Sequence, residues 1–235
     1  MSLPQATAVR EIAVDNSRRP VYYCVMPLSA PPRGPGRPPK ICASRLETRE
    51  ALIRCGTEIL TEKGFHSTGL DEVLKRVGVP KGSFYHYFAS KDEFGHAIID
   101  NYAAYFGRKL DRWLLDESRS PRARIADFVA DAKAGMVRHR FRRGCLVGNM
   151  GQELGGLHDG FRDRLQAVLD DWRRRTEACL EAARAAGEIA RDADCRRLAA
   201  FFWIGWEGAI LQAKLARSTA PLDLFAESFF AALPR

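Results

Sequence analysis

The sequence predicts an all-α fold with two helical domains behind an irregular N-terminal arm. Apolar residues recur every three or four positions through most of residues 45–235, as expected of helices that pack by one face. No segment alternates apolar and polar residues over the length of a strand. Glycine and proline separate the helical stretches. We expect an arm over residues 1–44, a three-helix domain over residues 45–94 and a larger helical domain over residues 95–235.

Composition limits the kinds of protein that the chain can be. A length of 235 residues is enough for one large or two small domains, and the formal net charge of +8 suits a polyanionic partner. The six cysteines form no CxxC pair and no His–Cys metal spacing, so we expect no disulfide framework, no metal and no cofactor. A reducing cytoplasm is the expected setting. No apolar run approaches the length of a membrane span.

Proline and arginine dominate the expected arm. The run PPRGPGRPPK denies the backbone both a helix and a strand ladder. Gly36-Arg37-Pro38 is similar to the core of AT-hook peptides, which insert an arginine into a minor groove. Two interpretations remain open: a solvated tail, or a basic arm in which Arg37 contacts DNA. Met26 is also an alternative start of the protein.

The first helix is expected over residues 45–63, with Gly64 as its stop. Its apolar residues recur at three- and four-residue steps, namely Leu52, Cys55, Ile59 and Leu60. A cysteine in such a stripe is more often a small core residue than a reactive thiol, so we interpret Cys55 as part of the core.

Two short segments follow, over residues 70–77 and 81–87, and the sequence GVP separates them. Gly78 suits the left-handed position that ends a helix, and Pro80 suits the first turn of the next one. Two helices of about two turns each, joined by so tight a corner, are typical of a helix-turn-helix.

The second of these segments has two different faces. Phe84 and Phe88 lie four residues apart, so they share the face that packs against Val73, Leu74 and Val77. The opposite face presents Lys81, Gly82, Tyr85 and His86. Such groups donate hydrogen bonds to phosphates and to base edges in a major groove. The alternative is that the tyrosines and the histidine of this segment are ordinary core aromatics.

The run GVPKGSFYHYFASKDEF resembles the recognition helix and the following turn of TetR-type transcriptional regulators. The resemblance implies a TetR-like fold, in which a helix-turn-helix domain precedes a ligand-binding and dimerisation domain, and double-stranded DNA as a partner. It implies that the groove is lined by Lys81, Gly82, Ser83, Tyr85 and His86. It also implies that Tyr87 and Lys91 contact phosphates.

This run departs from the family pattern at two positions. Gly69 stands where many members carry serine or threonine, so we expect Thr68 to take over the cap or the phosphate contact. Pro80 replaces the usual polar cap of the recognition helix, which puts the first N–H contacts of that helix in doubt.

The helices of the larger domain follow from their start and stop residues. A long helix begins after the N-cap Ser90 and runs to about Glu117, with a stripe of Phe94, Ile98, Tyr102, Tyr105 and Trp113. Pro121 starts the next, which ends near His139. Three more are expected over residues 161–186, 193–217 and 221–233, and the Arg173-Arg174-Arg175 run is interpreted as solvated surface.

The penultimate helix contains AAFFWIGWEGAIL, which is apolar nearly all the way round. A helix on the surface of a monomer is not apolar on every side, so this one must be covered on both faces. Gly205, Gly208 and Gln212 form a strip of low relief that allows another helix to approach. We infer a homodimer in which this strip and the terminal helix form a four-helix bundle across a two-fold axis.

A pocket for a small ligand is expected between two segments of the larger domain. If the second half of residues 140–155 is helical, one side of it presents Cys145, Asn149 and Gln152 or Glu153. In the apolar helix, one side presents Trp203, Glu207, Ile210 and Lys214. These groups, with Trp113 as a further candidate, are a plausible lining for an effector site.

The combination of GCLVGNMGQE with GAILQAKL resembles the regulatory domains of an acrylate-responsive and an electrophile-responsive group of TetR-type repressors, and the former more closely. In the electrophile-responsive group the cysteine of GCL is the responsive thiol and the lysine of QAK is its neighbour, which implies Cys145 and Lys214. Arg142, Arg143 and Lys214 are cations that would favour a thiolate at Cys145. Reversible binding of a small carboxylate, covalent sensing and a purely structural cysteine all remain open.

These observations predict a homodimeric repressor that binds a palindromic operator and is released by acrylate or a related carboxylate or electrophile. We do not expect an enzyme. One alternative is nevertheless a cysteine-dependent enzyme for a small acyl or unsaturated substrate, with His139 or His158 as its base. The other is an architectural DNA-binding protein without an effector.

Overall fold

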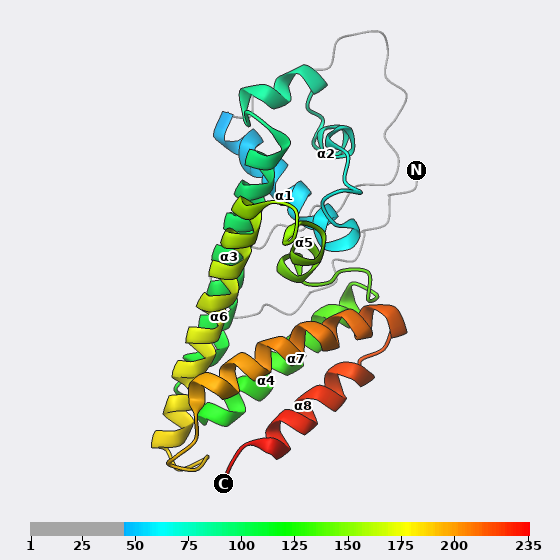
Figure 1. The fold of residues 1–235 in the computed structure, drawn as a ribbon. Coiled ribbons are helices and arrows are strands. Elements are labelled where there is room, and N and C mark those ends of the chain that lie inside the picture. Colours follow the sequence, from blue (N-terminus) through cyan, green and yellow to red (C-terminus); the bar gives the residue numbers. More distant parts are fainter. Residues whose placement is uncertain (1–44) are drawn as a thin grey trace, which may run out of the picture. The chain divides into compact units, whose positions relative to one another are not determined.

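A computed structural model describes residues 45–235, which contain α-helices and one 3₁₀ helix and no strand (Figure 1). The all-α prediction is therefore confirmed for this part of the chain, whereas Arg37 lies outside the described residues. The elements are α1 (Arg45–Lys63), α2 (Leu70–Val77), the 3₁₀ helix η1 (Lys81–His86), α3 (Lys91–Leu114), α4 (Pro121–Arg138), α5 (Leu146–Leu154), α6 (Asp159–Ala185), α7 (Cys195–Ala216) and α8 (Ala220–Ala232). No helix in this range is long and apolar enough to cross a lipid bilayer.

Helix α2 and η1 form the helix-turn-helix, and α1 precedes them in the same three-helix unit. α1 ends at Gly64 and α2 ends at Gly78, and both glycines have the left-handed backbone conformation, with φ of 83° and 76°. The segment after Pro80 is a 3₁₀ helix, which corrects the prediction of a second α-helix. Its turns close on the third residue, since the Ser83 N–H donates to the Pro80 carbonyl (2.9 Å) and the Tyr87 N–H donates to the Phe84 carbonyl (2.9 Å). Pro80 supplies no side-chain cap, and Gly82 favours an α-helix only weakly.

The predicted inner face of this segment is confirmed. Phe84 and Phe88 are buried with Val73 and Leu74 of α2. Their rings pack with that of Phe94 at the start of α3, at centroid separations of 4.8–5.6 Å. This aromatic cluster joins the helix-turn-helix to α3 and fixes which side of η1 faces solvent.

Helix α3 continues out of the helix-turn-helix and runs beside α6 (Figure 1). The predicted cap is confirmed, because the Ser90 hydroxyl accepts a hydrogen bond from the Glu93 N–H (3.0 Å). The predicted stripe is correct in its first half and wrong at Tyr105, which is exposed. Phe106 packs against the core instead, because a residue four positions after Tyr102 lies about 40° from it around the helix, whereas one three positions after it lies about 60° away on the other side.

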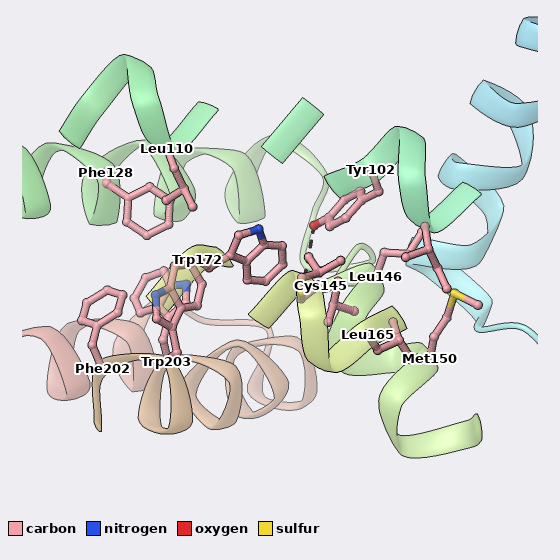
Figure 2. Close-up of a cluster of buried hydrophobic side chains, with 14 of the residues drawn as sticks. Tyr102, Leu110, Phe128, Cys145, Leu146, Met150, Leu165, Trp172, Phe202 and Trp203 are labelled. Carbon is pink, nitrogen blue, oxygen red and sulfur yellow. Dashed lines mark hydrogen bonds between the residues drawn. The ribbon is translucent and has the colours of Figure 1, made fainter. Parts of the chain in front are cut away.

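Helix α6 packs against α3, α4, α5 and α7, and the interior between them is built from large aromatic rings (Figure 2). Trp172 of α6 lies 4.9 Å from Trp203 of α7 and 4.4 Å from Phe106, measured between ring centroids. Phe128 of α4 closes this cluster from the other side. So many rings in contact make the interior of this part rigid.

Helices α7 and α8 pack together and leave an apolar surface. The predicted strip of Gly205, Gly208 and Gln212 lines an open groove, together with Leu224 of α8. At Gly205 the Phe225 ring of α8 occupies the place where a side chain would be. The exposed large side chains on the same two helices are Phe201, Ile204, Leu211, Leu215 and Leu224.

The cap at the start of α3 gives a stability prediction with a matched control. Ser90→Ala removes the hydrogen bond to Glu93 and should lower the free energy of unfolding by about 1 kcal/mol. Ser120 also precedes a helix, α4, but its side chain makes no cap hydrogen bond, so Ser120→Ala should change stability by only a few tenths of a kcal/mol. Urea unfolding at one fixed protein concentration compares the two. Equal losses in both variants would contradict the role given to Ser90.

Candidate DNA-binding surface and effector pocket

The outer face of η1 presents polar groups to solvent. Lys81, Gly82, Tyr85 and His86 are exposed, and Tyr85 keeps 68% of its surface accessible. The Lys81 ammonium pairs with Asp71 of α2 (2.9 Å), but both side chains are exposed, so the pair is weak and free to open toward a phosphate. Ser83 is half-buried on the same segment. An exposed phenol, imidazole and ammonium above a buried pair of phenylalanines suit insertion into a groove of duplex DNA.

Three residues predicted to contact phosphates or to cap α2 have internal partners. Thr68 is 2% exposed, and its hydroxyl donates to the Gly64 carbonyl (2.6 Å). It is therefore no cap for α2, whose N-cap is Gly69 with no side-chain hydrogen bond, and its burial argues against a phosphate contact. Lys91 donates to the Phe65 carbonyl (3.0 Å) and lies 4.5 Å above the Phe65 ring. Tyr87 is half-buried against the core.

Two arginines of α1 contact the recognition segment or the residues just after it, and the sequence did not predict these contacts. The Arg45 guanidinium at the start of α1 donates to the His86 carbonyl at the end of η1. Arg49, one turn later, lies 4.9 Å above the ring of Phe88. These arginines fasten η1 to α1 and add positive charge beside the predicted DNA-binding face. No pattern in the sequence indicates such tertiary contacts.

A cavity of about 300 Å³ lies between α1, α3, α4, the start of α5 and α7. Its lining includes Tyr102, Tyr105, Phe106 and Lys109 of α3, Met136 and His139 at the end of α4, Arg143 and Cys145 before α5, and Trp206, Glu207 and Ile210 of α7. The cavity is small and mixes aromatic walls with a few polar groups, as expected for a site that holds a small polar molecule.

Three of the residues expected at the effector site, Cys145, Glu207 and Ile210, line this cavity, and the others do not. Trp203 is buried in the aromatic core, where its indole N–H donates to the Thr176 hydroxyl (3.0 Å), and Trp206 faces the cavity instead. α7 is apolar nearly all round, so its sequence pattern does not reveal which side faces inward. Trp113 is half-buried beside Arg112, and Gln152 is exposed.

A chain of buried polar groups crosses the end of the cavity. The Tyr102 hydroxyl donates to Cys145 Sγ (4.0 Å), as Figure 2 shows. The Cys145 thiol in turn bonds to the Glu207 carboxylate. Glu207 Oε1 has no hydrogen-bond partner among the described residues. Tyr102 belonged to the predicted apolar stripe of α3. Its hydroxyl was the sequence signal that a polar group lies in this buried region.

Burial controls the protonation of these groups. Burial raises the pKa of Glu207 to about 7, and burial together with the Glu207 charge raises the pKa of Cys145 well above its usual value. The prediction of a thiolate at Cys145 is therefore wrong. The cations expected to stabilise it point elsewhere, since Arg143 pairs with Glu62 (3.1 Å) and Lys214 donates to the Glu62 carbonyl (3.3 Å). Cys145 itself is only 6% exposed.

Residues around α5 complete the hydrogen bonding at the end of α1. The Asn149 amide donates to the Leu60 and Thr61 carbonyls (3.3 and 3.1 Å), and the Gly144 N–H also donates to the Thr61 carbonyl (3.0 Å). The last carbonyls of an α-helix have no partner within the helix, so such groups must come from elsewhere. We call these contacts, with those of Lys214 and Glu153, the α1 brace.

Glu153 holds the other side of the α1 brace. Its carboxylate accepts hydrogen bonds from the Phe65 and His66 N–H groups (3.2 and 2.8 Å), just after α1 ends at Gly64. A side chain at Gly64 would overlap this carboxylate. Glu153, Asn149 and Lys214 were predicted to line the effector pocket, and the structure places them between that pocket and the helix-turn-helix. Their partners are some ninety or more residues away in most cases, so sequence spacing gives no sign of these contacts.

Comparison with known proteins identifies the family. The model for bacterial regulatory proteins of the tetR family matches residues 52–98. The model for the tetracyclin repressor-like C-terminal domain matches residues 121–229. The chain belongs to the TetR family. It is a helix-turn-helix transcriptional repressor of that family.

Similar proteins cover most of this TetR-family chain. It is 51% identical to the transcriptional regulator AcuR of Cereibacter sphaeroides over 209 residues, which are 87% of this chain and 95% of AcuR. It is 33% identical to the HTH-type transcriptional repressor NemR of Escherichia coli K12 over 184 residues, which are 75% of this chain and 89% of NemR. A crystal structure of the regulatory protein TetR from Rhodobacter sphaeroides is 53% identical, with a TM-score of 0.76 over 79% of this chain and 98% of its own.

Glu207 should make the stability of this TetR-family protein depend on pH. Its pKa is about 7 in the folded protein and near 4.5 in an unfolded chain, so its contribution is fully present below about pH 4.5 and is lost as the pH rises to about 7. The loss amounts to about 3 kcal/mol. Glu207→Gln should remove it, so the variant should gain stability relative to the wild type across this window. Urea unfolding at several pH values measures the difference. The exposed Glu117→Gln is the control, and a parallel gain there would contradict the assignment.

Proposed function

We propose that this protein represses transcription as a homodimer on a palindromic operator and is released by a small carboxylate such as acrylate. The observation that carries the proposal is the hydrogen-bonded link between an internal cavity and the helix-turn-helix. The acrylate-responsive group that the sequence resembles supports the choice of ligand. The cavity is small and its lining combines aromatic rings with basic and other polar groups, which suits an unsaturated acid of low mass.

The exposed apolar surface of α7 and α8 supports the homodimer. Leu215 keeps 75% of its surface accessible, and Ile204 and Leu211 are exposed on the same helix. Exposed large apolar groups that gather on one surface mark interaction sites more often than scattered ones do. Two copies that pair these surfaces by a two-fold axis form a four-helix bundle. The paired η1 segments would then reach successive major grooves, about 34 Å apart.

The α1 brace supplies a path from the cavity to the DNA-binding face. Cys145 and Glu207 line the cavity, and the neighbouring Gly144 and Asn149 bond to the end of α1. A ligand that moves the start of α5 changes the support of α1, and α1 holds η1 through Arg45. An effector that binds more tightly when the start of α5 is displaced lowers the affinity for the operator. The loss equals the difference between its binding free energies for the two arrangements, typically about 1–3 kcal/mol.

Reversible binding fits the environment of Cys145 better than covalent sensing does. A buried thiol with a raised pKa is a poor nucleophile, because the thiolate is the reactive form. The enzyme alternative also needs a base and an orienting acid beside the thiol. Among residues 45–235, no hydrogen bond joins Cys145 to a histidine, although His139 lines the same cavity. The cavity itself speaks against an architectural DNA-binding protein without an effector.

Tyr85→Ala tests the DNA-binding face. The side chain is exposed and packs nothing essential, so the variant should fold, lose operator affinity by about tenfold to a hundredfold, and discriminate less between operator and unrelated DNA. Fluorescence anisotropy with both duplexes at one salt concentration measures the two effects. Leu157→Ala, an exposed residue between α5 and α6, is the matched control. Wild-type affinity in the Tyr85 variant would refute this assignment.

Asn149→Ala tests the α1 brace. The variant loses two hydrogen bonds to the end of α1, while the cavity lining keeps its residues. We expect acrylate affinity within about threefold of the wild type, but an effector-induced loss of operator affinity about tenfold smaller. Calorimetry measures the first and anisotropy with and without acrylate the second. Gln152→Ala on the exposed side of α5 is the control. An unchanged effector response in the Asn149 variant would show that the signal travels by another route.

A further inference from the structure

Glu207 carries an unused hydrogen-bonding position inside the cavity. Its side chain comes from the middle of α7 and is buried, and Oε1 has no partner among the described residues. A buried polar atom without a partner destabilises the folded protein. Glu207 belongs to the wall of the cavity, so a ligand that moves its side chain slightly can supply the missing partner.

The neighbouring residues hold this carboxyl group in one orientation. The other oxygen, Oε2, lies against the backbone at Gly148 of α5, where any larger residue would collide with it. Cys145 bonds to the same carboxyl group, and Tyr102 supports Cys145 from α3. Three separate elements therefore fix Glu207, which is the arrangement expected of a group that recognises a ligand.

We propose that protonated Glu207 donates a hydrogen bond to the carboxylate of the effector, so that it selects for a carboxylate and effector binding takes up one proton. This inference rests on the proposed function of the cavity as a site for a small carboxylate. It makes Glu207 the residue that distinguishes an acid from its neutral isosteres. An ionised Glu207 would repel the carboxylate of the effector. In the complex, the Glu207 carboxyl and the effector carboxylate therefore share one negative charge and one proton.

Two of the other charged groups around the cavity have ion-pair partners of their own. Arg143 is engaged with Glu62 and Glu58, and Lys109 of α3 is engaged with Asp131 (2.8 Å). The titratable and charged groups that line the cavity besides Glu207 are Glu58 of α1, Tyr102, Tyr105 and Lys109 of α3, Arg138 and His139 at the end of α4, and Arg143 and Cys145 before α5. The basic groups among them attract an anion toward the cavity. Of these groups, Cys145 is the one that bonds to the Glu207 carboxyl.

The protonation of Glu207 sets the pH range of the effect. Its pKa is about 7 in the empty protein because burial disfavours the charge. Below that pH the carboxyl group already carries the proton that it donates. Above it, binding must first return a proton to Glu207, so the affinity for a carboxylate should fall by about tenfold for each further pH unit.

Calorimetric titration of the full-length protein with acrylate tests this inference. The titration is repeated from about pH 6 to about pH 8.5 in two buffers of different ionisation enthalpy, which reports proton uptake directly. We expect affinity to be nearly constant below about pH 7, to weaken about tenfold per unit above it, and uptake to approach one proton there. Glu207→Gln should abolish both the slope and the uptake. Glu117→Gln, an exposed residue outside the cavity, should keep both.

The possible results separate this inference from the function on which it depends. Tight acrylate binding with neither slope nor proton uptake in the wild type overturns the role of Glu207 and leaves the effector site in place. Equal binding of acrylamide, the neutral isostere, overturns the selection for a carboxylate. A covalent acrylate adduct in intact-mass spectra of the same samples overturns the reversible hydrogen bond. Absence of acrylate binding and of operator release at every pH overturns the proposed effector, and the inference with it.

Discussion

The end of α1 is the constraint on which the rest of this structure depends. An α-helix leaves its last carbonyl groups without partners, and here α5, the segment before it and α7 supply the donors. The same short stretch forms one wall of the cavity and supports the helix that carries η1. The DNA-binding unit is therefore not attached by α3 alone. Its position depends on hydrogen bonds that reach it from the walls of the cavity.

A rigid aromatic interior makes that dependence effective. Rings from α3, α4, α6 and α7 fill the space behind the cavity, and such close-packed groups do not yield gradually to a ligand. A molecule that enters the cavity must displace something less firmly held. α5 is short, begins after a loop and is joined to α1 by hydrogen bonds, so we expect it to be the element that shifts. The polar chain from Tyr102 to Glu207 ends beside it.

Local features of the sequence predicted the fold well, and tertiary features were out of reach. The first helix was predicted at residues 45–63, where the structure has it, because Gly64 and a regular apolar stripe define its end. The spacing of two phenylalanines predicted the buried face of η1. The sequence did not predict that η1 is a 3₁₀ helix. The sequence predicted the wrong tryptophan of α7 for the cavity wall. A helix that is apolar all round does not reveal which of its sides faces the cavity. The strip of Gly205, Gly208 and Gln212 followed from the sequence, but the Phe225 ring that packs onto Gly205 belongs to another helix and could not be predicted.

The contrast between Cys145 and Lys214 shows how one sequence motif can serve two purposes. The motif resembles that of the electrophile-responsive group, which implied a responsive thiol at Cys145, and the nearby cations were expected to favour its thiolate. In this structure the thiol bonds to an acid, Glu207, which favours the neutral form, while Lys214 donates to a carbonyl of α1. The lysine is thus part of the link to DNA, and the cysteine is part of the wall of the cavity. A carboxyl group that shares its proton with a ligand can then perform the recognition that a reactive thiol performs elsewhere, and it does so reversibly.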